Sequence, residues 1–257
     1  EGLVVMAAEG ATPVIALTGQ WTALNVSAST TFDGITFDGK NVAKYIIATL
    51  DSTAMTTDLT IKNCEFKNWL QWAISNQYEN NVSTNSVVID NCLFHDGTGA
   101  AISFSNNAPA GKQACEYFEM TNSTLYKISE SSYRGIINVG SNSEAEGDYN
   151  TVVIDHITMY DYTLINSGIA AIAIRKTHNL KISNSIIANP EDNGKTALNV
   201  YGGTVDRTIH YNGTKRSGST VYTNCYNTDP MFTHPEHGIF CLQEGSPAIG
   251  AATDGTN

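Results

Sequence analysis

The sequence is poor in proline, in charged residues and in long apolar runs. Its 257 residues include only 6 prolines, and 15% of the residues are charged. Lysine and arginine number 14 against 25 aspartates and glutamates, which gives a formal net charge of −11. Nucleic-acid-binding proteins present a basic face, and disordered tails carry far more charge, so both classes are excluded. No window supplies the roughly 18 apolar residues of a membrane-spanning helix, so we expect no transmembrane segment.

Asparagine is abundant instead, and many of the asparagines belong to an internal repeat. The octets 59–66 (LTIKNCEF) and 87–94 (VVIDNCLF) superimpose without a gap. The same frame fits 118–125 (FEMTNSTL), 152–159 (VVIDHITM) and 180–187 (LKISNSII), with weaker copies near 34–37 and 220–225. The copies follow one another at intervals of roughly 30 residues, which is typical of a repeat architecture.

Each copy predicts two short strands that meet at a bend. Apolar residues alternate before the asparagine, as at Leu59 and Ile61, and alternate again in a shifted phase after it, as at Cys64 and Phe66. One residue inserted at a corner returns the second apolar set to the interior. A further short apolar strand follows each copy, at 45–48, 72–75, 101–104, 136–139, 172–174 and 198–200.

Three short strands per ~30 residues predict an all-β solenoid, a single-stranded parallel β-helix of about seven or more coils. The asparagines then stack at one corner as a ladder that His156 interrupts, and each amide can bond its neighbours above and below. The predicted ladder residues are Asn63, Asn91, Asn122, Asn184 and Asn224. A β-sandwich is the alternative, but it gives no reason for one octet to recur at this spacing.

The five cysteines fit this geometry without disulfides. Five is an odd number, and the sequence has no CxxC or HExxH motif. Cys64 and Cys92 occupy the same inward position of adjacent coils, where free thiols behave as small apolar side chains. We therefore predict buried, unpaired thiols and no metal site.

The N-terminus begins abruptly in strand-like sequence at 1–5, with no signal peptide and no capping helix. A solenoid needs its terminal coils covered. We therefore expect residues 1–257 to form one β-helix domain of a longer chain, lacking its N-terminal region.

The C-terminal stretch carries a resemblance to known proteins. Residues 229–232 (DPMF) and 238–250 (GIFCLQEGSPAIG) resemble the closing segment of extracellular right-handed parallel β-helix proteins of the pectate-lyase-like superfamily. Residues 32–41 (FDGITFDGKN) and the repeated octets resemble β-helix domains of uncharacterised function that gut Bacteroidota encode beside polysaccharide-utilisation genes. The resemblance implies a right-handed helix and an exported, carbohydrate-directed protein, extracellular or on the outer cell surface.

The superfamily includes polysaccharide lyases, so a basic patch is a candidate lyase site. A lyase acting on uronic acids neutralises a carboxylate and presents a base to the sugar's α-proton. Arg175, Lys176 and Arg134 supply charge on the face that also presents Asn138, Asn199 and Tyr201. Calcium held by carboxylates such as Asp51 or Asp192 would be the cofactor of that reaction, and no other cofactor is expected.

A second candidate surface is an outward row of aromatic and polar residues. The row holds Asp38, Lys67, His95, Tyr126, Tyr160 and Ala188, with Trp69 and Tyr162 expected in the following turns. Aromatic faces on a flat solenoid side suit the C–H faces of sugar rings. The alternative is that these aromatics only cover the turns between strands.

These observations favour a non-catalytic domain that binds a polysaccharide or oligosaccharide as a monomer. The predicted contacts are Trp69, His95, Tyr126, Tyr160, Tyr162, Asn138, Asn199 and Tyr201. A polysaccharide lyase that uses Arg175, Lys176 and Arg134 for β-elimination is the enzymatic alternative, and a structural adhesin or stalk is the third. The net charge favours a neutral glycan, or an acidic glycan bound through calcium.

Overall fold

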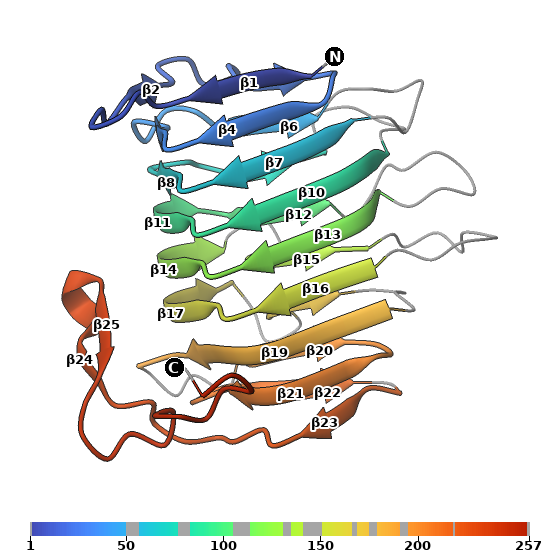
Figure 1. Cartoon of the computed structure of the whole chain (residues 1–257), viewed down its shortest axis with the longest axis vertical. Coiled ribbons are helices and arrows are strands. Elements are labelled where there is room, and N and C mark those ends of the chain that lie inside the picture. The colour runs from blue at the N-terminus through green and yellow to red at the C-terminus, as the bar shows by residue number, and fades with distance from the viewer. Residues whose placement is uncertain are drawn as a thin grey trace.

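The computed structural model shows a right-handed parallel β-helix, as the repeat predicts (Figure 1). It describes residues 2–49, 57–76, 83–104, 114–130, 135–140, 151–165, 169–174, 179–190, 195–217 and 219–255. The strands of successive coils pair in parallel and in register, so that each octet lies directly over the next. Leu59 pairs with Val87, for example, and Phe66 with Phe94. No helix among these residues is long and apolar enough to cross a membrane.

The coils build three faces, and the first two join into one 15-stranded sheet. The first face consists of β1 (Leu3–Met6), β4 (Thr30–Asp33), β7 (Asp58–Lys62), β10 (Thr84–Asp90), β13 (Cys115–Thr121), β16 (Thr151–Asp155), the start of β19 (Asn179–Ala188), β21 (Thr204–Ile209) and β23 (Val221–Thr223). The second consists of β2 (Val14–Ala16), β5 (Thr36–Asp38), β8 (Glu65–Lys67), β11 (Leu93–Thr98), β14 (Thr124–Glu130), β17 (Thr158–Leu164) and the end of β19. Because β19 runs through the corner without a break, it connects the two faces.

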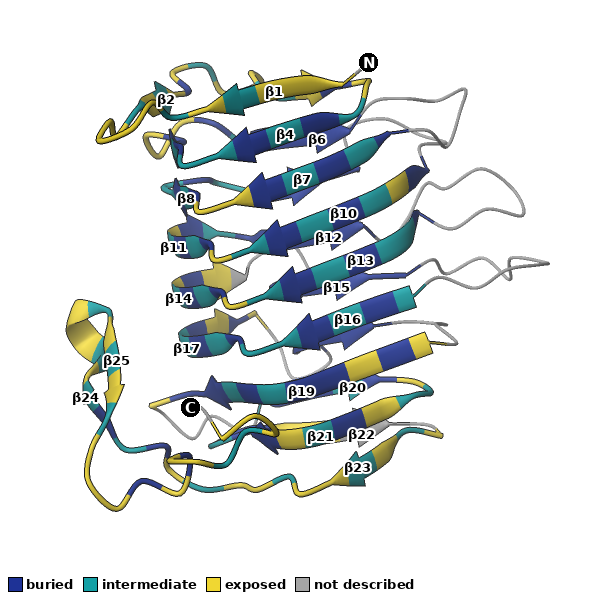
Figure 2. Ribbon diagram, viewed as in Figure 1, coloured by how far each residue is buried: buried dark blue, intermediate teal, exposed yellow. Residues whose placement is uncertain are grey.

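The third face is a separate eight-stranded sheet that closes each coil. Its strands are β3 (Leu24–Val26), β6 (Tyr45–Thr49), β9 (Trp72–Ser75), β12 (Ala100–Phe104), β15 (Ile137–Val139), β18 (Ala170–Ile174), β20 (Thr196–Val200) and β22 (Thr214–Ser217). Figure 2 shows buried residues recurring along the strands of the middle coils, whereas β1 is mostly exposed.

The core is a set of in-register rows between the faces. Phe37, Phe66 and Phe94 stack with ring centroids 4.7 and 4.8 Å apart, and the row continues through Leu125, Met159 and Ile187. Cys64, Cys92 and Cys115 are buried free thiols, as predicted. The prediction holds only in part for Cys225, which is half-buried, and it is wrong for Cys241, which is exposed on the C-terminal hairpin and outside the core.

The corner between the first two faces has the expected residues but a different bonding pattern. The corner asparagines have φ between 50° and 54°, in the left-handed region that asparagine tolerates better than most residues. Only Asn91 and Asn63 bond each other directly, at 2.7 Å. Asn63 and the remaining corner asparagines each donate to an aspartate of the preceding coil. The pairs are Asn63–Asp33, Asn122–Asp90, Asn184–Asp155 and Asn224–Asp206, at 2.7 to 3.0 Å.

The C-terminal residues leave the solenoid after β23 and pack on its outside (Figure 1). A hairpin of β24 (Phe232–His234) and β25 (Ile239–Leu242), joined by the short 3₁₀ helix η1 (Pro235–His237), lies against the second face. The residues 246–254 that follow, here called the covering segment, lie across the corner of the last coils.

Candidate functional site

The outward row of the second face is continuous, as the sequence predicts. Register pairs Asp38 with Lys67, Lys67 with His95, His95 with Tyr126, Tyr126 with Tyr160 and Tyr160 with Ala188. The same register, carried one coil further, aligns Ala188 with Tyr211, whose carbonyl accepts the Asn189 N–H at 3.1 Å. Tyr211 therefore extends the row, which we call the outer row.

Trp69 and Tyr162 do not lie on this surface, so their expected role as exposed sugar platforms is wrong. Both side chains are buried in the core. The reason is a second corner directly after the outer row, where Asn68 and Asp161 have φ of 60° and 52°. This second bend shifts the phase again and turns the next residue inward. Gly97 is required opposite Trp69, because a Cβ at that position would lie 2.1 Å from the indole ring.

The first part of the outer row is a polar network around Glu65. One Glu65 carboxylate oxygen lies 2.8 Å from His95 Nε2 and 2.9 Å from Lys67 Nζ, and the other accepts the Thr36 hydroxyl at 2.9 Å. His95 Nδ1 lies 2.7 Å from Asp96, and its ring stacks on Tyr126 at 5.1 Å. Partial burial of Glu65 opposes ionisation, but the hydrogen bonds outweigh it and lower the pKa of the carboxyl. Both ring nitrogens of His95 therefore have partners within this network.

The next part of the row is the platform on which the C-terminal hairpin packs. Phe240 meets Tyr126 at 5.6 Å and Tyr160 at 5.7 Å, and Phe232 meets Tyr160 edge-on at 5.7 Å. Lys127 Nζ donates to the backbone carbonyl of Glu236 at 2.9 Å. One side of each tyrosine is therefore covered by the C-terminal hairpin.

The far part of the row forms a cavity between the solenoid and the hairpin. The backbone positions of Tyr160 and Tyr211 lie two coils apart, about 9.5 Å at the usual strand spacing, and Ala188 between them is fully buried. The cavity has a volume of about 390 Å³. Its walls are Tyr160, Pro190, Tyr211, Asp229, Met231, Phe232, Pro235 and Gln243. We call it the tyrosine slot.

The polar groups of the slot carry negative charge. Asp229 accepts the Met231 N–H at 2.8 Å through one carboxylate oxygen, and its second oxygen is a further acceptor at the wall. The Gln243 amide donates to the Phe232 carbonyl at 2.7 Å, and its carbonyl oxygen is another acceptor. Burial raises the pKa of Tyr160, and the negative charges of Asp161, Asp229 and Glu236 raise it further. The slot thus combines aromatic faces with acceptors in a negative field.

The proposed lyase residues lie outside the described residues. They are Arg134, Arg175 and Lys176, together with the candidate calcium ligands Asp51 and Asp192. On the third face, Asn138 is buried, Asn199 is half-buried and Tyr201 is exposed. None of these three lines the slot, so the structure does not unite the two predicted surfaces. Within the described ranges, no three His, Cys, Asp or Glu side chains are placed to hold a metal ion.

Sequence reasoning missed Tyr211, Asp229 and Gln243. The octet is absent between Ser185 and Cys225, because Arg207 stands at the corner where most coils have asparagine, so the repeat does not reveal the coil that begins at Thr204. The signal was Asp206, which occupies the position before the corner as Asp33, Asp90 and Asp155 do. Asp229 and Gln243 belong to the C-terminal region, whose position on the second face no repeat encodes.

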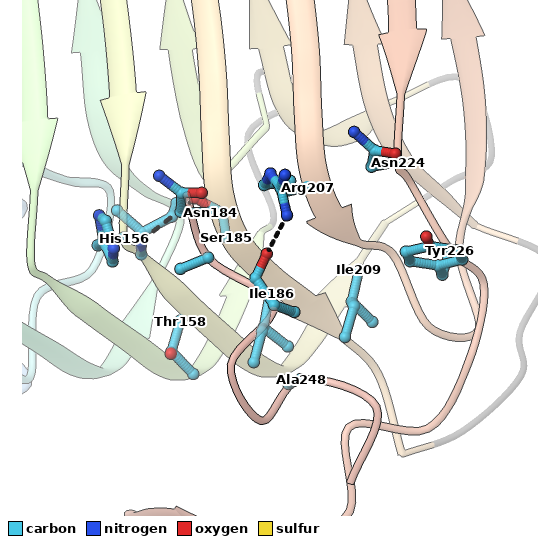
Figure 3. Close-up of a pocket in the computed structure, with 13 residues that line it drawn as sticks. His156, Thr158, Asn184, Ser185, Ile186, Arg207, Ile209, Asn224, Tyr226 and Ala248 are labelled. Atoms are coloured by element: carbon cyan, nitrogen blue, oxygen red, sulfur yellow. Dashed lines mark hydrogen bonds between the residues drawn. The ribbon is translucent and has the colours of Figure 1, made fainter. Parts of the chain in front are cut away.

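The first corner carries a second hollow, here called the corner groove. Over the early coils it is open, has a volume of about 430 Å³ and is lined by polar residues that include Thr36, Asn63, Glu65 and Asn91. Over the late coils the covering segment covers part of it, which leaves a hollow of about 200 Å³ (Figure 3).

No protein-family model and no curated protein matches the chain.

Proposed function

We propose that this chain is a carbohydrate-directed β-helix domain that binds a neutral polysaccharide or oligosaccharide at the tyrosine slot, without catalysis. The observation that carries the proposal is that Tyr160 and Tyr211 line one slot together with Asp229 and Gln243. Both tyrosines line the slot, so a flat sugar ring bound there can pack on an aromatic face.

The polar groups support a sugar as the bound ring. Sugar-binding sites combine apolar faces with a few placed polar groups that fix the orientation of the ligand. Tyr160 and Tyr211 provide the faces, and the Asp229 carboxylate and the Gln243 carbonyl accept hydrogen bonds from hydroxyl groups. The negative charge near the slot favours neutral sugars over acidic ones, because Asp161, Asp229 and Glu236 repel the carboxylates of uronic acids.

The resemblance to the pectate-lyase-like superfamily, and to β-helix domains encoded beside polysaccharide-utilisation genes in gut Bacteroidota, supports the same proposal. It favours an extracellular or cell-surface location and a glycan partner. The resemblance concerns the repeat and the closing motif, which specify architecture, so the choice of binding over lyase chemistry depends on the slot.

Isothermal titration calorimetry with neutral oligosaccharides tests the proposal, with oligogalacturonate as the acidic comparison. We expect binding of a neutral oligosaccharide, a loss of at least tenfold in affinity in Tyr211→Ala, and weak or no binding of oligogalacturonate. Trp21→Ala removes an exposed aromatic side chain at the other end of the solenoid and is the matched control. Unchanged affinity in Tyr211→Ala, or equal loss in both variants, would remove the slot as the binding site.

A further inference from the structure

The cavity beneath the covering segment has features of a second binding site, separate from the tyrosine slot. Its floor is formed by the corner of the late coils and its roof by the covering segment (Figure 3). Figure 3 shows Ile186, Ile209 and Ala248 gathered on one side of the hollow, with His156 and Asn184 at one end and Tyr226 at the other. The cavity thus has an apolar body and a polar rim.

The floor and roof leave space that neither fills. Ile157 and Ile209 are buried and Ile186 is half-buried, whereas the roof contributes the small side chains of Ala248 and Ala251. An engineered apolar cavity of about 150 Å³ in another protein stays dry and takes up benzene. The cavity of about 200 Å³ is therefore large enough for a molecule slightly larger than benzene.

Arg207 gives this cavity a hydrogen-bond donor. It stands at the corner position, with φ of 47°, where Asn63, Asn91 and Asn122 stand in other coils. Its Nη1 donates to the Ala251 carbonyl at 2.9 Å, and its Nε lies 3.7 Å from Asp206. A guanidinium has five N–H donors in a fixed fork, so donors remain for an acceptor on a ligand.

The charges around the rim disfavour an anionic ligand. Asp206 already accepts Thr223 and Asn224, and these hydrogen bonds, with Arg207 beside it, hold its pKa below the ordinary value. Asp254 lies 3.5 Å from His156 at the opposite end. An added carboxylate would meet these negative charges, whereas a neutral acceptor would gain the Arg207 hydrogen bond without that repulsion.

We propose that this cavity binds an uncharged, mainly apolar molecule of about six to nine non-hydrogen atoms that carries one hydrogen-bond acceptor, such as an aromatic ketone or aldehyde. The apolar body lies on Ile186 and Ile209, and the acceptor points to the Arg207 guanidinium. The covering segment shields the bound molecule from water.

Methyl NMR of isoleucine-labelled protein tests this site with acetophenone, toluene and benzoate as probes. We expect acetophenone to shift the Ile157, Ile186 and Ile209 signals at concentrations about tenfold lower than toluene, with benzoate the weakest. Ile46 and Ile74, in the core of the early coils, are the internal reference and should not move. The proposal fails if no signal of the three isoleucines shifts, or if benzoate binds more tightly than acetophenone.

Two substitutions locate the site. Arg207→Asn restores the residue that most other coils carry at this corner, so the fold is retained. It should weaken acetophenone about tenfold and leave toluene within twofold. Ala248→Leu fills the cavity and should weaken both probes at least tenfold, whereas Ile249→Ala alters an exposed side chain of the same segment and should change neither. Equal acetophenone affinity in wild type and Arg207→Asn would overturn the acceptor assignment, and unchanged binding in Ala248→Leu would overturn the location.

Discussion

The two halves of the corner groove have the same backbone and different surroundings. Asn63 and Asn91 in the early half have φ of 54° and 50°, and His156 and Asn184 in the late half have φ of 51° and 50°. The early half is the more open and the more polar of the two, whereas the covering segment lies over part of the late half. The bend alone therefore does not decide whether the groove is covered.

Side chains at the corner and directly after it make the difference. His156 and Arg207 replace asparagine in the late half, and both contact the covering segment. The position two residues after the corner is Thr36, Glu65, Leu93 or Thr124 in early coils and Thr158, Ile186 or Ile209 in late coils, so isoleucine is more frequent there in the late coils. Covering this part of the corner stabilises the protein, because it removes apolar surface of Ile186 and Ile209 from water. The comparison shows that a repeat can keep its geometry while its surface acquires two different roles.

The largest expected effect is on the free energy of unfolding, and it compares the core beneath the early half of the corner groove with the core beneath the late half. Phe66→Ala should lower the free energy of unfolding by roughly 3–5 kcal/mol, and Ile187→Ala at the corresponding late position by roughly 2–5 kcal/mol. Phe66 should be the more sensitive because its ring also stacks on Phe37 and Phe94. Urea denaturation of both variants measures the difference. A larger loss at Ile187 would show that the aromatic row does not dominate the core.

The next effect tests the attachment of the covering segment. The Asn184 side chain donates to Asp155 and exchanges two hydrogen bonds with Thr253, whereas the Asn122 side chain donates to Asp90. Asn184→Ala should therefore destabilise the protein by about 1–2 kcal/mol more than Asn122→Ala. Thermal denaturation measures this difference.

The corresponding glycine variants separate hydrogen bonding from backbone strain, because glycine adopts positive φ without cost to a Cβ. The difference between Asn184→Gly and Asn122→Gly should remain about as large as that between the alanine variants. If it disappears, strain rather than contact with the covering segment explains the result.

The smallest effect is a pH dependence in the outer row near the early half. Burial of Asp38 opposes ionisation, but hydrogen bonds from Asn68 and Lys40 and the Lys40 charge lower its pKa to about 2. A carboxyl with a lowered folded-state pKa stabilises the fold above its unfolded pKa of about 4. That contribution is lost as pH falls from about 4 to about 2.

Unfolding of wild type and Asp38→Asn between pH 5 and pH 2 measures this contribution. The wild-type protein should lose more stability over this interval than the variant. The same pH series for Asp206→Asn, beside the covered half, provides the comparison. The pKa of Asp206 is also lowered, chiefly by the Thr223 hydrogen bond. Parallel pH curves for wild type and Asp38→Asn would contradict the assignment.

The corner pattern also explains part of the acidic composition. Asp33, Asp90, Asp155 and Asp206 precede the corner in every second coil, and each accepts the asparagine of the coil that follows. From the sequence alone the expected ladder consisted of asparagines bonded to one another. Aspartate precedes the corner in every second coil, and this alternation is complete only when Arg207 is recognised as a corner residue that follows Asp206.

The sequence alone determined the β-helix, its Asn-centred corner, the inward rows and the outer row, because parallel coils stack equivalent residues at a fixed spacing. It did not reveal the second corner that buries Trp69 and Tyr162. One residue in the left-handed region, Asn68 or Asp161, reverses which side chains point inward, and no repeated residue type marks that position. It also did not place the hairpin or the covering segment. Their positions depend on contacts between residues far apart in the chain, and those contacts alone create the tyrosine slot and the covered cavity.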